Sequence, residues 1–244
     1  MQDLLITSCS NVISETPEVL VTLNSLKNVG FNGDKIVFTN WMPYHIGKRF
    51  FDDGFNIKII SQSHKIDVVG TDVLRYFLEA MSSQAYRNIY VTDCRDVFFI
   101  RTFQQIQPLE HVFLTNEKWK YKDKQWNIND MNLLMNYFPK KDFMDWDVIN
   151  GGGLIFGGQE NMFRFYLIQH ACVNQFSQAS NQAIINYFYH TCNMYDWKTT
   201  DKYFCLTGSA ISGKESLYNY HEYSVFHQWD RTILKKEIIK NWAF

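Results

Sequence analysis

The chain has 244 residues, 46% of them hydrophobic, and 24 basic and 25 acidic side chains that give a formal net charge of −1. That composition suffices for one packed core, and the evenly spread charge excludes a basic stripe for nucleic acid or a polybasic membrane patch. Five cysteines without C-x-x-C spacing favour a reducing compartment over a disulfide framework or a zinc knuckle. We find neither a basic leader with an apolar segment nor a run of about 18 apolar residues, so we expect a cytoplasmic protein without a signal peptide or transmembrane segment.

Strands and helices alternate through the first hundred residues. The expected strands cover residues 3–7, 35–40, 56–61 and 88–93, and the expected helices begin at Pro17 and end before Gly30, then cover 43–53 and 71–86. Pro17 suits a first helical turn, and a glycine suits a helix end. This β-α order predicts an α/β fold with a mostly parallel central sheet flanked by helices.

The fourth expected strand leads directly into a charged motif, Thr-Asp93-Cys-Arg95-Asp96-Val. Ligands of open α/β sheets bind at the carboxyl ends of the strands, so two carboxylates here indicate a site. The alternative is structural: Asp93 caps the next turn and Asp96 pairs with Arg95. Residues i and i+3 of a strand face opposite sides, so the two acids share a metal only if Cys94 and Arg95 form a tight turn.

Several other nucleotide-binding classes lack their signatures. The loop after the first strand, Ser8 to Asn11, contains no glycine, which argues against a Rossmann dehydrogenase. The P-loop pattern is also absent. An aspartyl-nucleophile phosphatase would need a second acid at the position of Arg95.

The second half is less regular. We expect a strand over 111–117, a charged and aromatic loop over 119–126, helices over 129–138, 159–175 and 180–190, and a final strand over 224–231 that carries His227 and Asp230. Residues 147–158 predict an apolar strand interrupted by three consecutive glycines, where a backbone approaches a ligand closely. Asn150 precedes these glycines and offers both a donor and an acceptor. A bulge without a ligand is the alternative, and a lone histidine such as His227 is more often structural than a ligand.

Taken in order, these motifs resemble the GT-A nucleotide-sugar glycosyltransferases, in particular the group that contains glycogenin and the bacterial lipo-oligosaccharide galactosyltransferases. The matching segments are Leu74-Arg75-Tyr76, the acidic motif, Asn150-Gly-Gly-Gly-Leu-Ile-Phe-Gly, Asn181-Gln-Ala-Ile-Ile-Asn and His227. The resemblance implies one GT-A domain over 1–244, with a nucleotide-binding half (1–100) and an acceptor-binding half (101–244). It implies transfer of a hexose or pentose from a nucleoside diphosphate sugar, UDP-sugars favoured, to a glycan or other hydroxyl acceptor.

The resemblance also assigns roles to individual residues. Asp93, Asp96 and His227 would hold Mn²⁺ or Mg²⁺, and Asp93 would alternatively hold the ribose or reach the metal through water. The donor would contact Thr7, Ser8, Asn40, Arg75, Asp93 and Arg95. The donor sugar and acceptor would contact Asn150, Gly151, Gly152, Asn181 and Gln182. The residues expected to act in catalysis are Asp93, Asp96, Asn181 and Gln182.

Two departures from the family pattern keep alternatives open. The acids are spaced Asp-Cys-Arg-Asp instead of D-x-D, and Asn181 stands where the family has an aspartate, so it is no general base. Inversion would need another carboxylate such as Asp145 or Asp147; we favour retention. Arg75 would otherwise form a surface ion pair, and segment 119–126 either closes over the donor or is an ordinary exposed loop.

Two other classes compete with an active glycosyltransferase. One is a catalytically silent relative that binds a glycan or a nucleotide, which Arg95 and Asn181 make credible. The other is a nucleotidyltransferase, which is disfavoured because the loop Ser8 to Asn11 lacks glycine and basic residues. If no metal binds, Arg95 and Arg75 would neutralise the diphosphate instead.

Overall fold

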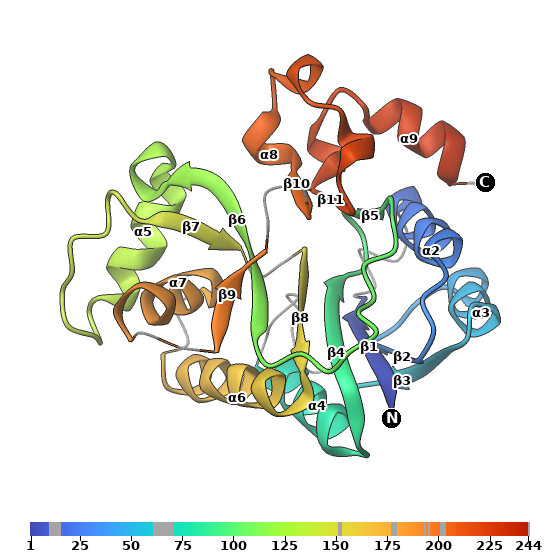
Figure 1. Cartoon of the computed structure of the whole chain (residues 1–244), viewed down its shortest axis with the longest axis horizontal. Coiled ribbons are helices and arrows are strands. Elements are labelled where there is room, and N and C mark those ends of the chain that lie inside the picture. The colour runs from blue at the N-terminus through green and yellow to red at the C-terminus, as the bar shows by residue number, and fades with distance from the viewer. Residues whose placement is uncertain are drawn as a thin grey trace.

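An eight-stranded sheet runs through the centre of the molecule, and helices cover both of its faces (Figure 1). The computed structural model describes residues 1–9, 16–60, 71–150, 153–176, 180–192, 194, 196–200 and 204–243. The strand order is β3-β2-β1-β4-β8-β6-β7, with β9 paired to β6. The chain therefore forms a single α/β domain with a mostly parallel central sheet, as the sequence predicts.

The N-terminal half supplies the parallel part of this sheet. Its elements are β1 (Gln2–Ser8), α2 (Pro17–Val29), β2 (Asp34–Thr39), α3 (Tyr44–Asp52), β3 (Phe55–Ile59), α4 (Thr71–Ser82) and β4 (Tyr86–Asp93). Strands β3, β2, β1 and β4 are all parallel neighbours. The β-α-β-α-β alternation is confirmed, and α2 begins at Pro17 and is capped by Gly30 at φ 71°.

The second half adds antiparallel strands and a helical layer. Its elements are β5 (Val97–Phe99), β6 (Val112–Lys120), α5 (Gln125–Leu134), β7 (Asp147–Asn150), β8 (Leu154–Gly158), α6 (Gln159–Gln175), α7 (Asn181–Thr191) and β9 (Trp197–Thr199), with a 3₁₀ turn η1 (Tyr121–Asp123). β8 is antiparallel to both β4 and β6, and β7 is antiparallel to β6. The glycine-interrupted segment thus contributes two strands to one sheet.

A second, three-stranded sheet lies against the edge where β4 ends (Figure 1). It is ordered β10-β11-β5, and the C-terminal segment that builds it comprises β10 (Cys205–Thr207), α8 (Gly208–Ile211), η2 (Glu215–Leu217), η3 (Tyr220–Glu222), β11 (Val225–His227), η4 (Trp229–Arg231) and α9 (Lys235–Trp242). β11 pairs antiparallel with β5, and this pairing joins the end of the chain to its middle.

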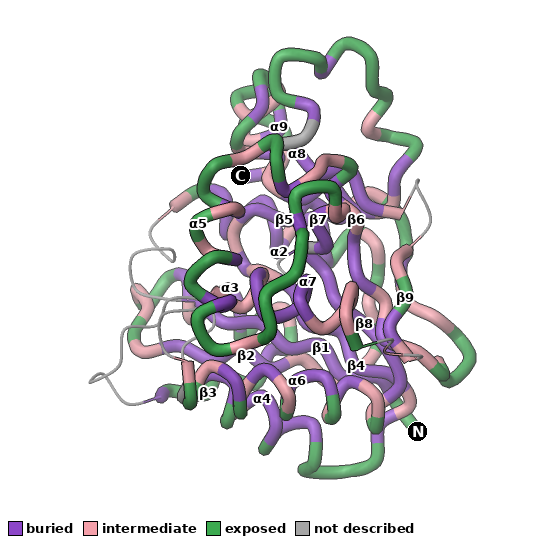
Figure 2. Tube along the Cα trace, turned by 90° about the vertical axis from the view of Figure 1, so that its left-hand side faces the viewer, coloured by how far each residue is buried: buried purple, intermediate pink, exposed green. Residues whose placement is uncertain are grey.

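The core lies on both faces of the central sheet, and buried residues follow its strands (Figure 2). One cluster packs α4 and α6 against the sheet, and the apolar face of α4 contributes Val73, Leu74, Phe77, Leu78 and Met81, each at most 9% exposed. A second cluster packs α2, α3 and β5 against the other face. No helix among the described residues is long and apolar enough to cross a bilayer.

Some predicted boundaries are wrong. The segment 119–126 is not a loop: β6 continues to Lys120, a 3₁₀ turn buries Tyr121, and α5 begins at Gln125. The helix expected over 129–138 lies four residues earlier, over Gln125–Leu134, and a turn separates its end from Phe138, where Pro139 disfavours helical backbone.

Two more elements are shorter than expected. The helix expected to Tyr86 ends at Ser82, where the hydroxyls of Ser82 and Ser83 bond back to main-chain carbonyls of α4. The strand expected over 224–231 ends at His227, because Gln228 adopts φ 55° and breaks the extended backbone.

Candidate functional site

Strands β1, β2 and β4 end at the same edge of the sheet. Ser8, the last residue of β1, is in register with Asp93, the last residue of β4, and with Phe38 of β2. Thr7 and Ser8 are each 3% exposed, and Asn40 follows directly after β2. The first half thus places Thr7, Ser8, Asn40 and Asp93 at one edge, as the parallel topology requires.

Asp96 and His227 reach this edge through the small sheet. Cys94 to Asp96 form a tight bend between β4 and β5, and β5 pairs with β11 so that Val97 lies opposite His227. His227 Nε2 is 3.6 Å from Asp93 Oδ2 and 3.9 Å from Asp96 Oδ1. One potential ligand atom from each residue lies within 4.8 Å of the others. The bend therefore brings together two acids that a straight strand would separate.

Burial and mutual charge perturb the protonation of this cluster. Burial alone would lower the pKa of His227, but the nearby carboxylates of Asp93 and Asp96 raise it above its ordinary value. Burial, opposed by the nearby His227 imidazole, raises the pKa of Asp93 to about 6. Near pH 6, protons therefore compete with any divalent cation for the Asp93–His227 pair.

The donor set fits a hard divalent cation. Two carboxylate oxygens and one imidazole nitrogen are ligands that Mn²⁺ accepts readily. Ligand atoms about 2.1 Å from one octahedral ion lie roughly 3 to 4.2 Å apart. The distances of 3.6 and 3.9 Å from His227 Nε2 to the oxygens of Asp93 and Asp96 fall in this range. The side chains of Asp96 and His227 are 9% and 3% exposed, whereas that of Asp93 keeps 22% exposure. One side of the cluster is thus buried, and Asp93 lies on its accessible side.

Gly153 makes room for His227. A Cβ at Gly153 would lie 2.7 Å from Cγ and 2.9 Å from Cβ of His227, far inside normal contact. Its carbonyl accepts a hydrogen bond from the Thr92 hydroxyl at 2.9 Å, which fixes the start of β8 beside the end of β4. The group that Gly153 approaches closely is thus the His227 side chain, and the approach of a ligand to these glycines stays a prediction. Gly151, Gly152 and the side chain of Asn150 lie outside the described part of the structure.

Arg95 lies on the outer side of the cluster. Its Nη2 is 3.9 Å from Asp96 Oδ2 and 3.9 Å from Oδ2 of Asp230, which belongs to η4. The ion pair with Asp96 that the structural alternative predicts is therefore present, together with the converged acids. The sequence placed Asp230 near His227 but gave it no role.

Asn181 and Gln182 form the first turn of α7, which the Ser180 hydroxyl caps through the amide N–H of Ala183. Asn186, one turn later, bonds both the N–H and the carbonyl of Ile149, so this end of α7 lies beside the end of β7. The side-chain amide of Asn181 and Nε2 of Gln182 are buried and have no hydrogen-bond partner in the described part of the chain. Among the described residues, these amides make no hydrogen bond to the carboxylate cluster.

The structure does not bring Arg75, Asp145 or Asp147 into the cluster. Arg75 is 54% exposed on α4, lies 3.7 Å from Glu79, and places its guanidinium over the Tyr76 ring. Asp145 pairs with Lys122 at the surface, and Asp147 pairs with Lys120. The surface ion pair considered for Arg75 is thus observed, and both candidate bases for inversion are engaged by lysines.

One buried acid near the cluster was not predicted. Glu117 of β6 is 2% exposed. Burial lowers the pKa of His227, and the charge of Glu117 adds to those of Asp93 and Asp96 in raising it. The available signal was weak: an acid within the expected strand over 111–117, directly after Thr115 and Asn116.

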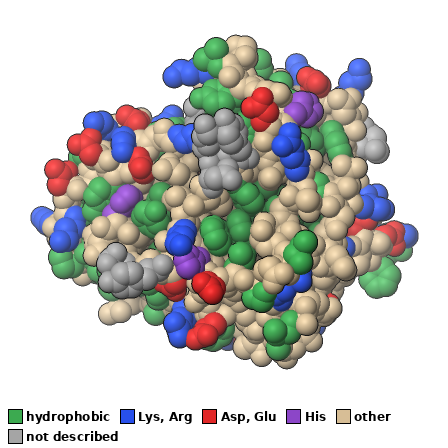
Figure 3. Space-filling view, in the orientation of Figure 1, with side chains coloured by type: hydrophobic (Ala, Val, Ile, Leu, Met, Phe, Trp, Pro, Cys, Tyr) green, Lys and Arg blue, Asp and Glu red, His purple; other side chains and the backbone are tan. Residues whose placement is uncertain are grey.

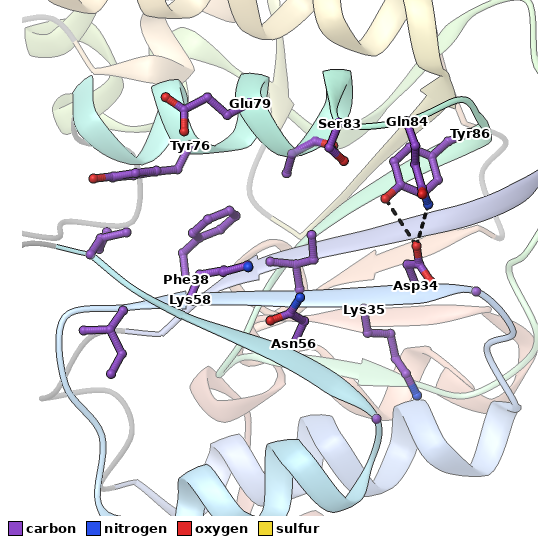
Figure 4. Close-up of a pocket in the computed structure, with 16 residues that line it drawn as sticks. Asp34, Lys35, Phe38, Asn56, Lys58, Tyr76, Glu79, Ser83, Gln84 and Tyr86 are labelled. Carbon is purple, nitrogen blue, oxygen red and sulfur yellow. Dashed lines mark hydrogen bonds between the residues drawn. The ribbon is translucent and has the colours of Figure 1, made fainter.

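Surface features elsewhere do not coincide with the cluster. A groove of about 650 Å³ lies between α4 and the edge strand β3. Asp34, Tyr86 and Gln84 meet at one end of it, and Tyr76 lies near the other (Figure 4). On the face shown in Figure 3, acidic and basic side chains are interspersed. This face offers no strongly charged patch of one sign.

Comparison with known proteins decides the fold family. No protein-family model matches the chain, and no curated protein matches it. Among solved structures, the galactosyltransferase LgtC with donor and acceptor sugar analogues matches at TM-score 0.59 and 10% identity over 99% of this chain and 95% of that one. An active-site mutant of LgtC matches at TM-score 0.60 and 9% identity. The chain has a GT-A-like glycosyltransferase fold.

A further match extends this GT-A-like fold to a larger protein. The glycosyltransferase GlyE of Streptococcus pneumoniae TIGR4 matches at TM-score 0.60 and 7% identity, over 100% of this chain and 60% of GlyE. At such identities the likeness establishes the fold. Within the GT-A-like fold, Asp93, Asp96 and His227 lie at the carboxyl end of β4.

Proposed function

We propose that the protein transfers a sugar from a nucleoside diphosphate sugar to a hydroxyl group of a glycan or other acceptor, assisted by a divalent cation. The observation that carries this proposal is the convergence of Asp93, Asp96 and His227 within 4.8 Å in a fold shared with glycosyltransferases. We favour a UDP-sugar donor, with residues 1–100 binding the nucleotide and 101–244 the acceptor.

Asp93, Asp96 and His227 would hold Mn²⁺ or Mg²⁺, which when bound supplies positive charge that stabilises the departing diphosphate. His227 is buried and Asp93 is partly accessible, so the accessible side faces the donor. Thr7, Ser8 and Asn40 line the neighbouring edge, where they would contact the nucleoside. Arg95 is 37% exposed and would place a second cation beside the phosphates.

Asn181 and Gln182 would bind hydroxyl groups of the sugars. Buried amide groups without protein partners are costly unless a ligand or water satisfies them. A sugar hydroxyl provides both a donor and an acceptor for such an amide. Because an amide takes up no proton at neutral pH, Asn181 would orient a substrate, and we favour retention of anomeric configuration.

A second candidate function is binding without catalysis. The ion pair between Arg95 and Asp96 favours it, because a guanidinium at the acidic motif opposes a divalent cation. In that case the site would bind a nucleotide or glycan, with arginines in place of the metal.

The two functions are separated by a panel of UDP-, GDP- and ADP-sugars with Mn²⁺, Mg²⁺ or EDTA, scored by thermal shift and by release of nucleoside diphosphate. We expect a metal-dependent shift and turnover with one class of donor, both reduced in Asp96→Asn. Stabilisation without turnover would favour the binding protein. No shift and no turnover with any donor would contradict the glycosyltransferase and favour a silent relative that binds a glycan.

A further inference from the structure

Arg95 lies between two carboxylates, and its position bears on the acidic motif. Asp96 directs Oδ1 toward His227 Nε2 at 3.9 Å and Oδ2 toward Arg95 Nη2 at 3.9 Å. The same Nη2 lies 3.9 Å from Asp230 Oδ2. One carboxylate oxygen of Asp96 thus faces the candidate metal position, while the other faces a guanidinium that Asp230 shares.

The main chain on both sides of this guanidinium is fixed. The Thr22 hydroxyl bonds the carbonyls of Arg95 and Val97 at 3.1 and 2.8 Å. Gln228 donates its N–H to the Asp96 carbonyl at 2.7 Å, and Trp229, next to Asp230, is fully buried. The backbones that carry the two acids are therefore held together, and the long Arg95 side chain is the part free to move between them.

A second close approach holds the Asp230 side of this arrangement. A Cβ at Gly208 would lie 2.0 Å from the Gln228 carbonyl oxygen, so α8 packs directly against the turn that carries Asp230. Asp230 Oδ1 is buried and has no hydrogen-bond partner among the described residues. This oxygen and Oδ2 together could accept two parallel hydrogen bonds from a guanidinium. Arginine prefers this bidentate geometry with a carboxylate.

We propose that Asp230 is a positioning residue that draws the Arg95 guanidinium off Asp96 when a divalent cation binds there. This inference rests on the proposed function, since it concerns the cation held by Asp93, Asp96 and His227. Without Asp230, Arg95 has Asp96 as its nearby carboxylate, and a guanidinium beside a divalent cation opposes binding. With Asp230, the guanidinium keeps an anionic partner and lies on the outer side of the cluster.

A double-mutant cycle on Mn²⁺ affinity tests this role without any substrate. Wild type, Arg95→Met, Asp230→Asn and the double variant are titrated with Mn²⁺ alone, with free Mn²⁺ measured by electron paramagnetic resonance. We expect Asp230→Asn to raise Kd on the order of tenfold, and Arg95→Met to undo most of that rise in the double variant, as coupled neighbours do. In the wild-type background, Arg95→Met should change Kd by less than about threefold.

The matched control is Asp145→Asn, which removes the same charge from a side chain that is 80% exposed and paired with Lys122; its Kd should equal that of wild type. If Asp230→Asn does not fold, Asp230→Glu carries the test: it retains the carboxylate and should hold Kd within about threefold, whereas a tenfold rise would overturn the proposal. Equal effects of Arg95→Met in both backgrounds would overturn the positioning role alone. A wild type that binds no Mn²⁺ would overturn it together with metal assistance.

Discussion

Replacing Gly153 with alanine should displace His227 and weaken cation binding. The added Cβ would lie 2.7, 2.9 and 3.0 Å from Cγ, Cβ and Nδ1 of His227. These atoms lie at the base of a side chain that is 3% exposed, so they cannot rotate away as the end of a flexible side chain would. Restoring ordinary contact near 3.5 Å requires a shift of most of an ångström in β8 or in the imidazole.

The expected magnitudes follow from that shift. Overpacking of this size costs about 2 kcal/mol of unfolding free energy, or roughly 4 to 8 °C in Tm for a chain of this length. Misorienting a metal-ligating histidine should lower Mn²⁺ affinity at least about tenfold. Isothermal titration with Mn²⁺ and a thermal melt measure the two effects.

The matched control is Gly47→Ala in α3, where a Cβ would make only ordinary contact with Met42 at 3.5 Å. This variant should retain Mn²⁺ affinity and melt at or above the wild-type temperature, because alanine favours a helix over glycine. Wild-type affinity and Tm in Gly153→Ala would refute the reasoning that Gly153 exists to admit His227.

Three further predictions address the cluster and the fold. Asp96→Asn removes one charged ligand and should lower Mn²⁺-dependent turnover by on the order of 100-fold, and His227→Ala should weaken Mn²⁺ binding similarly; unchanged kinetics and affinity would make both residues structural. Because the folded-state pKa of Asp93 is raised to about 6 and that of His227 is also raised, proton binding stabilises the metal-free fold at low pH, and this contribution is lost as pH rises through those values. The increase in Tm caused by Mn²⁺ should therefore grow from about pH 5 to pH 7.5 as protons leave the ligands, and a pH-independent increase would exclude Asp93 and His227 as ligands. Asp3 is fully buried and accepts hydrogen bonds from Arg87 Nε and Nη2 at 2.9 and 2.7 Å and from Gln104 at 2.6 Å, so Asp3→Ala should cost about 3 kcal/mol in urea denaturation; the exposed Glu160→Ala should cost nothing measurable, and equal stability of the two variants would contradict the argument.

Local sequence pattern was sufficient for the parallel half of the fold. Pro17 and Gly30 mark the ends of α2, and the 3.6-residue spacing of Val73, Leu74, Phe77, Leu78 and Met81 marks α4. These signals are local, because a helix cap or an amphipathic stripe depends only on residues a few positions apart. The alternation then placed Asp93 at the carboxyl edge of the sheet.

Tertiary structure alone decided where the short elements lie. β9 and β10 have three residues each, too few to show a hydrophobic period, and they become strands only through pairing with β6 and with β11. β11 lies within the strand expected over 224–231, but its antiparallel pairing with β5 was not predicted. β11 also ends at a left-handed Gln228, which no pattern in the sequence announced. Strand pairing between distant segments is set by packing, so propensity alone leaves it undetermined.

The candidate site divides in the same way. The residue types were readable from the sequence: two acids after a buried strand, a late histidine and a run of glycines. Their convergence was not, because it needs the bend at Cys94 and Arg95 and the antiparallel pairing of Val97 with His227, 130 positions later in the chain. The second partner of Arg95 was likewise not predicted, since Asp230 approaches it only when the turn after β11 is fixed on the Asp96 carbonyl. Sequence thus specified the chemical groups, and long-range backbone pairing specified the distances between them.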